Sequence, residues 1–212
     1  MIGIIRVLTT SNPEILGEHG AIIEGKYGVA TRSACIPDQP HGVYDEETER
    51  IAVPKIVALG KELAASGCRV LVVSCADDPG GKELRRHVSV PVIGAGSAAA
   101  FVACGFGEPV GLLDITSTPP RVMQEALGEQ LAWHACPEGV TNTTDLLTPS
   151  GQKEALRAAR SLVEKGAKTL AFACTGYSTI GKAQLIRKEL GTTVIDPVEA
   201  EGLLAFYALN RS

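Results

Sequence analysis

Two cysteines follow buried apolar runs at matching positions of a repeated pattern. Cys75 comes directly after Val-Leu-Val-Val-Ser, and Cys174 after Thr-Leu-Ala-Phe-Ala. The two are 99 residues apart (174 − 75 = 99), and the same offset places Gly67 on Gly166. The chain therefore reads as two copies of one unit, each with a cysteine at a strand end.

A pair of thiols on opposite walls of a cleft can act on opposite faces of one carbon. One thiolate removes a proton and the other thiol returns one from the far side, which inverts the stereochemistry without a cofactor. A free thiol has a pKa of ~8.5, so its surroundings must activate it. Both cysteines precede an expected helix start, where N–H groups and the helix dipole favour a thiolate. We therefore expect Cys75 and Cys174 to be catalytic, with lowered pKa values.

Residues at the same strand ends can hold a substrate. Backbone N–H groups after each cysteine suit a carboxylate or an enolate, and Asp77 adds an acid or base. Hydroxyl side chains gather after two further runs, although each can equally serve as a cap or turn residue. The candidate substrate-binding residues are Thr9, Thr10, Ser11, Ala76, Asp77, Ser117, Thr118, Thr175 and Gly176.

Other polar residues near these ends have competing interpretations. Asp78 is followed by a proline, so we expect it to cap a helix that begins at Pro79. His41 and Tyr44 lie in the loop 37–44, which either closes over a substrate or is a plain surface loop. The remaining histidines are not grouped with carboxylates at metal-ligand spacing, so no metal is predicted.

Apolar runs of strand length alternate with helical patterns along the whole chain, which is typical of parallel sheets covered on both faces. In such sheets ligands bind beyond the carboxyl ends of the strands, where all the candidate residues lie. Expected strands cover 2–8, 27–35, 69–74, 90–93, 110–115, 131–135, 169–173 and 194–195. Expected helices include one from Pro13 capped by Asn12, one from 45 with Pro54 as a kink or a new start, and one over 178–190.

The repeat divides the chain into two lobes. Gly3 to Thr10 aligns with Gly111 to Thr118, which extends the duplication to the first strand of each copy. We expect a first lobe of residues 1–97 plus 198–212 and a second lobe of residues 98–197.

The bulk composition excludes several classes of protein. The net charge of −4 over 212 residues gives no support to a nucleic-acid surface. The uncharged stretch 88–107 is long enough to span a membrane, but Pro91 and four glycines interrupt it, so a buried strand and helix explain it better. The N-terminus has no basic region before its apolar run, and no C-x-x-C pair occurs among six cysteines. A cytoplasmic location with reduced thiols is expected.

With these residues the chain resembles the cofactor-independent aspartate/glutamate/hydantoin racemase superfamily over essentially its whole length. The resemblance rests on the duplication, the two strand-end cysteines and Val-Ile-Asp-Pro-Val-Glu-Ala at 194–200. It implies two pseudo-symmetric Rossmann-like lobes, each with a four-stranded parallel sheet flanked by helices, and an active site in the cleft between them. It also implies catalysis by Cys75 and Cys174, substrate-holding hydroxyls at the positions given above, and no cofactor.

The motif around the first cysteine points to one branch of that superfamily. Amino-acid racemases usually continue with Asn-Thr, whereas Cys-Ala-Asp-Asp-Pro-Gly at 75–80 is closer to the hydantoin and allantoin racemases. Strand-end stretches without Lys, Arg, Asn or Gln also suit a neutral cyclic ureide better than an acidic amino acid, unless Arg6, Arg32 or His41 reaches the cleft.

The expected function is therefore that of an isomerase, a racemase or epimerase acting on a small molecule at a carbon next to a carbonyl. Two other enzymes stay open, an aspartate/glutamate racemase and a maleate-isomerase-like enzyme. A non-catalytic two-lobed sensor of small molecules is the alternative from another class. No nucleic-acid or membrane partner is expected, and a homo-oligomer is left open.

Overall fold

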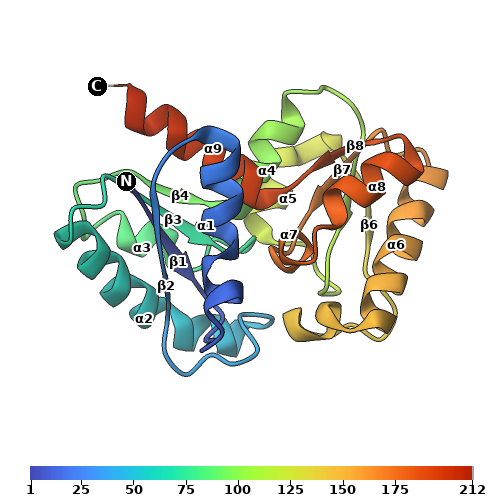
Figure 1. Cartoon of the computed structure of the whole chain (residues 1–212). Coiled ribbons are helices and arrows are strands. Elements are labelled where there is room, and N and C mark those ends of the chain that lie inside the picture. Colours follow the sequence, from blue (N-terminus) through green and yellow to red (C-terminus); the bar gives the residue numbers. More distant parts are fainter. Residues whose placement is uncertain (212) are drawn as a thin grey trace.

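The computed structural model describes residues 1–211 and contains two parallel four-stranded sheets that lie side by side (Figure 1). Their strand orders are β2-β1-β3-β4 and β6-β5-β7-β8, so one topology occurs twice. The α/β fold expected from the sequence, with two four-stranded parallel sheets flanked by helices, is confirmed. The strands are β1 Ile2–Arg6, β2 Thr31–Cys35, β3 Val70–Ser74, β4 Val92–Gly94, β5 Val110–Leu113, β6 Leu131–Ala135, β7 Thr169–Phe172 and β8 Thr193–Ile195.

Helices cover both faces of each sheet. In the first unit α1 and α9 pack on one face and α2 on the other, while in the second α4 and α6 take opposite faces. The α-helices are α1 Pro13–Tyr27, α2 Glu46–Ala65, α3 Gly81–Leu84, α4 Ala95–Cys104, α5 Arg121–Leu127, α6 Pro149–Glu164, α7 Gly176–Thr179, α8 Lys182–Leu190 and α9 Pro197–Asn210. Two 3₁₀ helices, η1 Gly128–Gln130 and η2 Thr143–Leu147, complete the elements.

The register of the strands brings the polar residues to one edge of each sheet. Arg6 pairs with Ser74 and with Cys35, so β1, β2 and β3 end level. In the second sheet Leu113 pairs with Phe172. Cys75 directly follows β3, and one residue, Ala173, separates Cys174 from the end of β7. Both cysteines therefore lie beyond the carboxyl edges of the sheets.

Several boundaries differ from those expected. The helix α1 begins at Pro13 with Asn12 as its N-cap, as predicted, but it continues through Tyr27, which the sequence pattern placed in a strand. The left-handed Gly28 (φ 65°) then ends the helix. Pro54 lies inside a continuous α2 and starts no new helix. The expected helix over 178–190 is two helices, separated at Gly181 (φ 61°).

The role predicted for Asp78 is wrong. Pro79 starts no helix, and Asp78 itself is left-handed with φ 52°. Its carboxylate instead accepts hydrogen bonds from Gly96 N at 2.8 Å and Ser97 N at 3.1 Å, at the start of α4. The residue therefore caps a helix 17 residues further along the chain (95 − 78 = 17), a pairing that a local pattern does not reveal.

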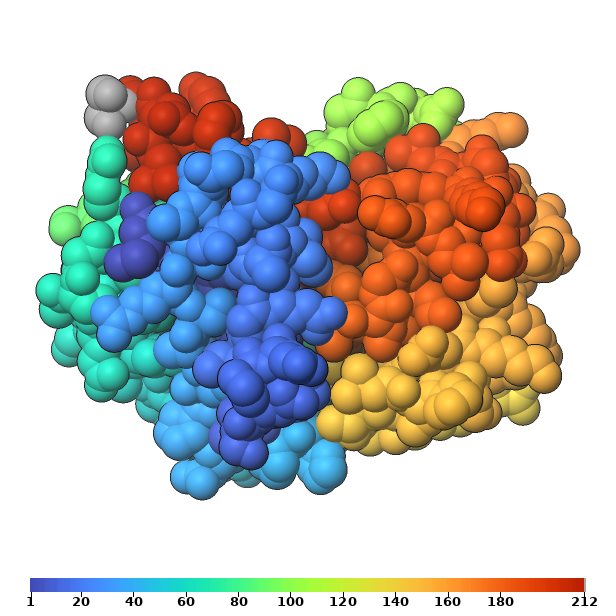
Figure 2. All heavy atoms as spheres, viewed as in Figure 1, coloured from blue at the N-terminus to red at the C-terminus, as the bar shows by residue number. Residues whose placement is uncertain are grey.

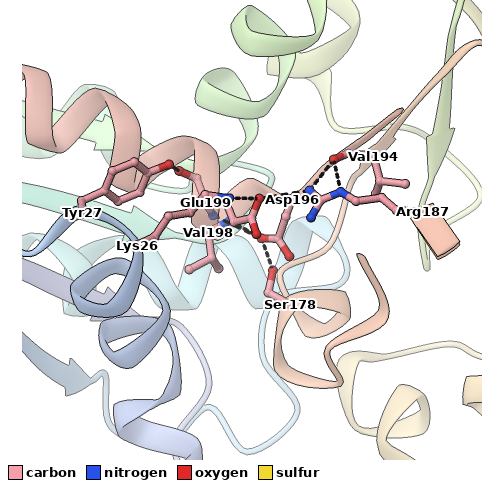
Figure 3. A network of polar contacts seen from close by, with 8 residues as sticks. All are labelled: Lys26, Tyr27, Ser178, Arg187, Val194, Asp196, Val198 and Glu199. Carbon is pink, nitrogen blue, oxygen red and sulfur yellow. Dashed lines mark hydrogen bonds and ion pairs between the residues drawn. The ribbon is translucent and has the colours of Figure 1, made fainter. Parts of the chain in front are cut away.

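The chain returns from the second sheet to the first through α9 (Figure 3). Asp196 caps this helix by accepting from Val198 N at 2.8 Å, and the Ser178 hydroxyl donates to the same oxygen at 2.7 Å. Glu199 pairs with Lys26 of α1 at 2.7 Å and with Arg187 of α8 at 3.0 Å. One carboxylate thus ties together a helix from each unit.

On the face seen in Figure 2, the blue atoms of α1 meet the orange atoms of the 176–190 region along a narrow seam. The helix α9 packs against α4, α1 and β3, and so contacts elements of both units. The division into a lobe of 1–97 plus 198–212 and a lobe of 98–197 stays a proposal. Within residues 1–211 no helix combines the length and the apolar character needed to cross a membrane.

Candidate active site

A cavity lies between the carboxyl edges of the two sheets, and both cysteines line it. Its walls are mainly apolar. The volume that the centres of water molecules can occupy inside it is about 30 Å³. The lining residues are Arg6, Val7, Leu8, Ile15, Gly42, Val43, Ser74, Cys75, Ala76, Asp77, Asp114, Ile115, Thr116, Thr143, Leu147, Ala173, Cys174, Thr175, Gly176 and Thr179. A space this small holds about two water molecules, which is less room than a ring-sized ligand needs.

The two thiols have matching local geometry. The N–H of Gly176 points at the sulfur of Cys174, with a nitrogen–sulfur distance of 3.4 Å. The N–H of Asp77 makes the equivalent bond to Cys75, again from two residues further on. Thr143 adds a hydroxyl 3.9 Å from the Cys174 sulfur. Each turn therefore supplies one backbone donor to its thiol.

The expected lowering of the thiol pKa values is wrong. Burial raises the pKa of Cys174 to about 12, because the backbone bond from Gly176 compensates only part of the desolvation. Burial, followed by the charge of Asp77, raises the pKa of Cys75 well above its usual value. The helices after the cysteines, α3 and α7, have four residues each, so they offer little dipole. Burial therefore favours the thiol form of both groups at neutral pH.

Asp77 and Asp114 bring two carboxyl groups into the cavity. Burial raises the pKa of Asp77 to about 7, and the nearby charge of Asp114 adds to the effect. The Asp114 carboxylate accepts from the Thr116 hydroxyl at 3.0 Å and is 3.2 Å from His134 Nε2. Hydrogen bonds to Asp114 and then to Cys136 raise the pKa of His134 to about 9, so the histidine is charged and pairs with Asp114 at neutral pH.

Six of the eleven residues selected from the sequence line the cavity: Cys75, Ala76, Asp77, Cys174, Thr175 and Gly176. The others are not among its lining residues. The Thr9 hydroxyl donates to Ile36 O at 2.6 Å and accepts from Gln39 N at 2.7 Å, so it holds the following loop. The Thr10 hydroxyl accepts from Asn12 N, and Thr118 presents its carbonyl to Thr116. Ser11 and Ser117 are likewise outside the lining.

Other lining residues are not among the eleven candidates. Arg6 is 4% exposed, lies at the end of β1, and donates to Ile15 O at 2.6 Å. Of the three residues named above that could bring a charge to the cleft, it is the one that lines the cavity. From the loop 37–44 the cavity takes Gly42 and Val43, while His41 and Tyr44 are not among the lining residues. Thr143 comes from η2, for which no pattern was recognised.

Within residues 1–211 no three His, Cys, Asp or Glu side chains are grouped so that they could hold a metal ion. The sequence-based prediction that the site needs no metal and no cofactor stays a prediction.

Comparisons with known proteins place this geometry in a family. The model of the Asp/Glu/Hydantoin racemase family matches residues 23–201. A hydantoin racemase of Rhizobium meliloti is 27% identical over 188 residues, which cover 82% of this chain and 76% of that protein. Allantoin racemase from Klebsiella pneumoniae superposes with a TM-score of 0.80 at 22% identity, over 98% of this chain and 86% of that one. Allantoin racemase from Pseudomonas fluorescens gives 0.82 at 17% identity, over 98% and 90%.

The fold and the family match define an isomerase of the racemase class. The chain belongs to the Asp/Glu/Hydantoin racemase family, and the resemblance to its hydantoin and allantoin branch is confirmed.

Proposed function

We propose that the protein racemises a five-membered cyclic ureide, such as a 5-substituted hydantoin or allantoin, with Cys75 and Cys174 as its two bases. The observation that carries the proposal is the placement of the two thiols at matching turns of one cavity, each with a backbone N–H at its sulfur. In the forward direction one thiolate takes the proton from the ring carbon and the opposite thiol returns one. The reverse direction exchanges these roles.

The raised thiol pKa values favour an acidic substrate carbon. A ring carbon between a carbonyl and a nitrogen loses its proton more readily than the α-carbon of an amino-acid carboxylate, so a small thiolate fraction suffices. The apolar walls suit a neutral ring, and the hydroxyls of Thr116 and Thr143 can pair with its polar edge. Relatives named hydantoin racemase and allantoin racemase support the same substrate class.

Arg6 supports a second candidate, an acidic amino acid. It is the cation in the cavity lining, and a guanidinium can bind a carboxylate. Two observations favour the ureide over this candidate. Arg6 is bound to the carbonyls of Ile15 and Leu16, and Asp77, whose pKa is about 7, repels a dicarboxylate when it is ionised.

The test is the decay of circular dichroism with L- and D-benzylhydantoin, allantoin, aspartate and glutamate. The expected result is faster loss of signal with a ureide than with either amino acid. Faster loss with aspartate or glutamate than with every ureide would overturn the substrate class. The protein with both cysteines changed to serine measures the uncatalysed background.

A further inference from the structure

A buried chain of polar side chains lies behind the cavity. The Glu201 carboxyl oxygen Oε1 is 2.6 Å from the Ser74 hydroxyl, which is 2.7 Å from His19 Nδ1. On the other side of the ring, His19 Nε2 is 3.2 Å from the Thr179 hydroxyl. Glu201 and His19 are 0% exposed and Ser74 is 1% exposed. Neither Glu201 nor His19 has a role in the proton transfer proposed above.

This chain joins the two turns that carry the cysteines. Ser74 precedes Cys75, whereas Thr179 ends the short helix that follows Cys174. The Thr175 hydroxyl also donates to Ser74 O at 3.4 Å, and the Thr175 carbonyl accepts a bond from the His19 ring. His19 comes from α1 and Glu201 from α9, so four elements meet here.

This hydrogen-bonded chain has two arrangements because a neutral imidazole donates at one nitrogen and accepts at the other. When Glu201 carries a proton, it donates to Ser74, Ser74 donates to His19 Nδ1, and Nε2–H donates toward Thr179 and the Thr175 carbonyl. When Glu201 is ionised, Ser74 donates to Glu201, Nδ1–H donates to Ser74, and Thr179 donates to Nε2 in place of its bond to the Glu18 carboxylate. The two arrangements differ by the single proton on Glu201, and the His19 tautomer changes with it.

We propose that Glu201, Ser74 and His19 are positioning residues that hold the two cysteine turns together, and that the proton on Glu201 sets the direction of their hydrogen bonds. The protonated arrangement is the working one, because only there does His19 donate to the residue after Cys174. The second oxygen of Glu201 has no hydrogen-bond partner among residues 1–211. A buried carbonyl oxygen of a neutral carboxyl group costs less free energy without a partner than a buried oxygen of a charged carboxylate does.

The charges around Glu201 agree with this arrangement. Burial raises the pKa of Glu201 to about 8, although the Ser74 bond and the charge of Arg6 act against it. Asp78 and Asp196 face it as like charges and add to the rise. Burial, and then Arg6, lowers the pKa of His19 well below its usual value, so the ring is neutral throughout. At the far end Thr179 also bonds the Glu18 carboxylate.

Nitrogen-15 NMR of histidine-labelled protein tests the chain without any substrate. His19→Gln identifies the His19 signals among the four histidines. We expect the Nε2–H tautomer below a pH of about 8 and the Nδ1–H tautomer above it, with no charged ring in between. In Glu201→Gln, which cannot ionise, one tautomer should persist from pH 6.5 to 10. A single tautomer across this range in the unchanged protein would overturn the proposal, as would an unchanged switch in Glu201→Gln.

Activity tests the positioning role, and this part rests on the proposed function. Ser74→Ala breaks the chain and should lower kcat by about 10²-fold with little change in KM, since small misplacements of reacting groups have effects of that order. Ser66→Ala, which removes a hydroxyl at the end of α2, is the matched control and should be neutral. Glu201→Gln should equal the unchanged protein at pH 7 and exceed it at pH 9.

Full kcat in a folded Ser74→Ala, or identical pH profiles for Glu201→Gln and the unchanged protein, would contradict the positioning role. If the unchanged protein racemises none of the tested compounds, the proposed function fails. The tautomer measurement still tests whether the proton on Glu201 sets the direction of the hydrogen bonds through Ser74 and His19.

Discussion

Cys75 and Cys174 are equally buried at 7% exposure, and each receives one backbone N–H. Changing either to serine should reduce racemisation by roughly 10²–10⁴-fold, because a hydroxyl is far too weak an acid to replace a thiolate. Polarimetry of both variants gives the measurement. Cys104→Ser is the control: Cys104 is in α4, outside the cavity lining, and should keep full activity. Near-normal turnover by either active-site variant would exclude the two-base mechanism.

The buried thiols also predict how the rate depends on pH. A pKa of about 12 for Cys174 means that the thiolate is scarce at neutral pH, and its fraction rises roughly tenfold per pH unit below that value. We therefore expect the kcat/KM of Glu201→Gln to rise steadily from pH 6.5 to 9, since this variant removes the titration of Glu201. A profile that is flat above pH 7 would show that a thiol pKa is much lower than burial indicates.

For single residues, the sequence selects the two cysteines as candidates but predicts the wrong direction for the shift of their thiol pKa values. Their types and spacing are visible along the chain. Burial, however, depends on side chains distant in the sequence, such as Val43 for Cys75 and Leu146 for Cys174, and it outweighs the local N–H bond at each sulfur. Thr143 and Glu201 are not predicted for the same reason, since each reaches the site region only through tertiary packing.

Among the elements, the start of α4 is held by Asp78. The N-cap of this helix is Gly94, which has no side chain, so the Asp78 carboxylate from the turn after Cys75 accepts from the first N–H groups instead. Asp78→Ala should destabilise the protein by about 0.5–2 kcal/mol, the usual cost of losing a cap. Asp78→Asn keeps an acceptor and tolerates the left-handed backbone, so it should lose less. Thermal unfolding compares the two, and equal melting temperatures for all three proteins would contradict the cap.

Gly96 allows α4 to approach the turn that carries Cys75. A Cβ at this position would lie 1.7 Å from the carbonyl oxygen of Ala76, so the turn must move. Gly96→Ala should therefore lower both stability and activity. Gly17→Ala is the matched control, since it lies within α1 with nothing within 4 Å of its Cβ, and it should stabilise the helix by about 0.5–1 kcal/mol. Unchanged activity in Gly96→Ala would show that the turn tolerates displacement.

The sequence predicted the order of helices and strands because apolar runs and proline-led caps are local signals. Asn12 before Pro13 marks a helix start in both the pattern and the structure. The pattern failed where distant contacts decide, as at Asp78. It also failed at Tyr27, an aromatic residue typical of strands that ends a helix and donates to Glu199 O at 2.7 Å.

For the whole molecule, the duplicated pattern predicts two matching sheets and therefore a site between them. It does not predict how tightly the lobes close. The closeness of the lobes depends on hydrogen bonds between them, such as that from Thr175 to Ser74. It also depends on the ion pairs of Glu199 with Lys26 and Arg187 (Figure 3). The small volume of the cavity, about 30 Å³, likewise follows from packing and from nothing in the sequence.

The two-base inversion is tested most directly by turnover of one benzylhydantoin enantiomer in deuterated water, with deuterium at the ring carbon measured early in the reaction. Cys75 and Cys174 on opposite walls predict that the product carries solvent deuterium while the recovered substrate stays unlabelled, because a different thiol delivers the new hydrogen. The variant with both cysteines changed to serine sets the spontaneous background. Unlabelled product, or label in substrate and product at equal early rates, would contradict the account.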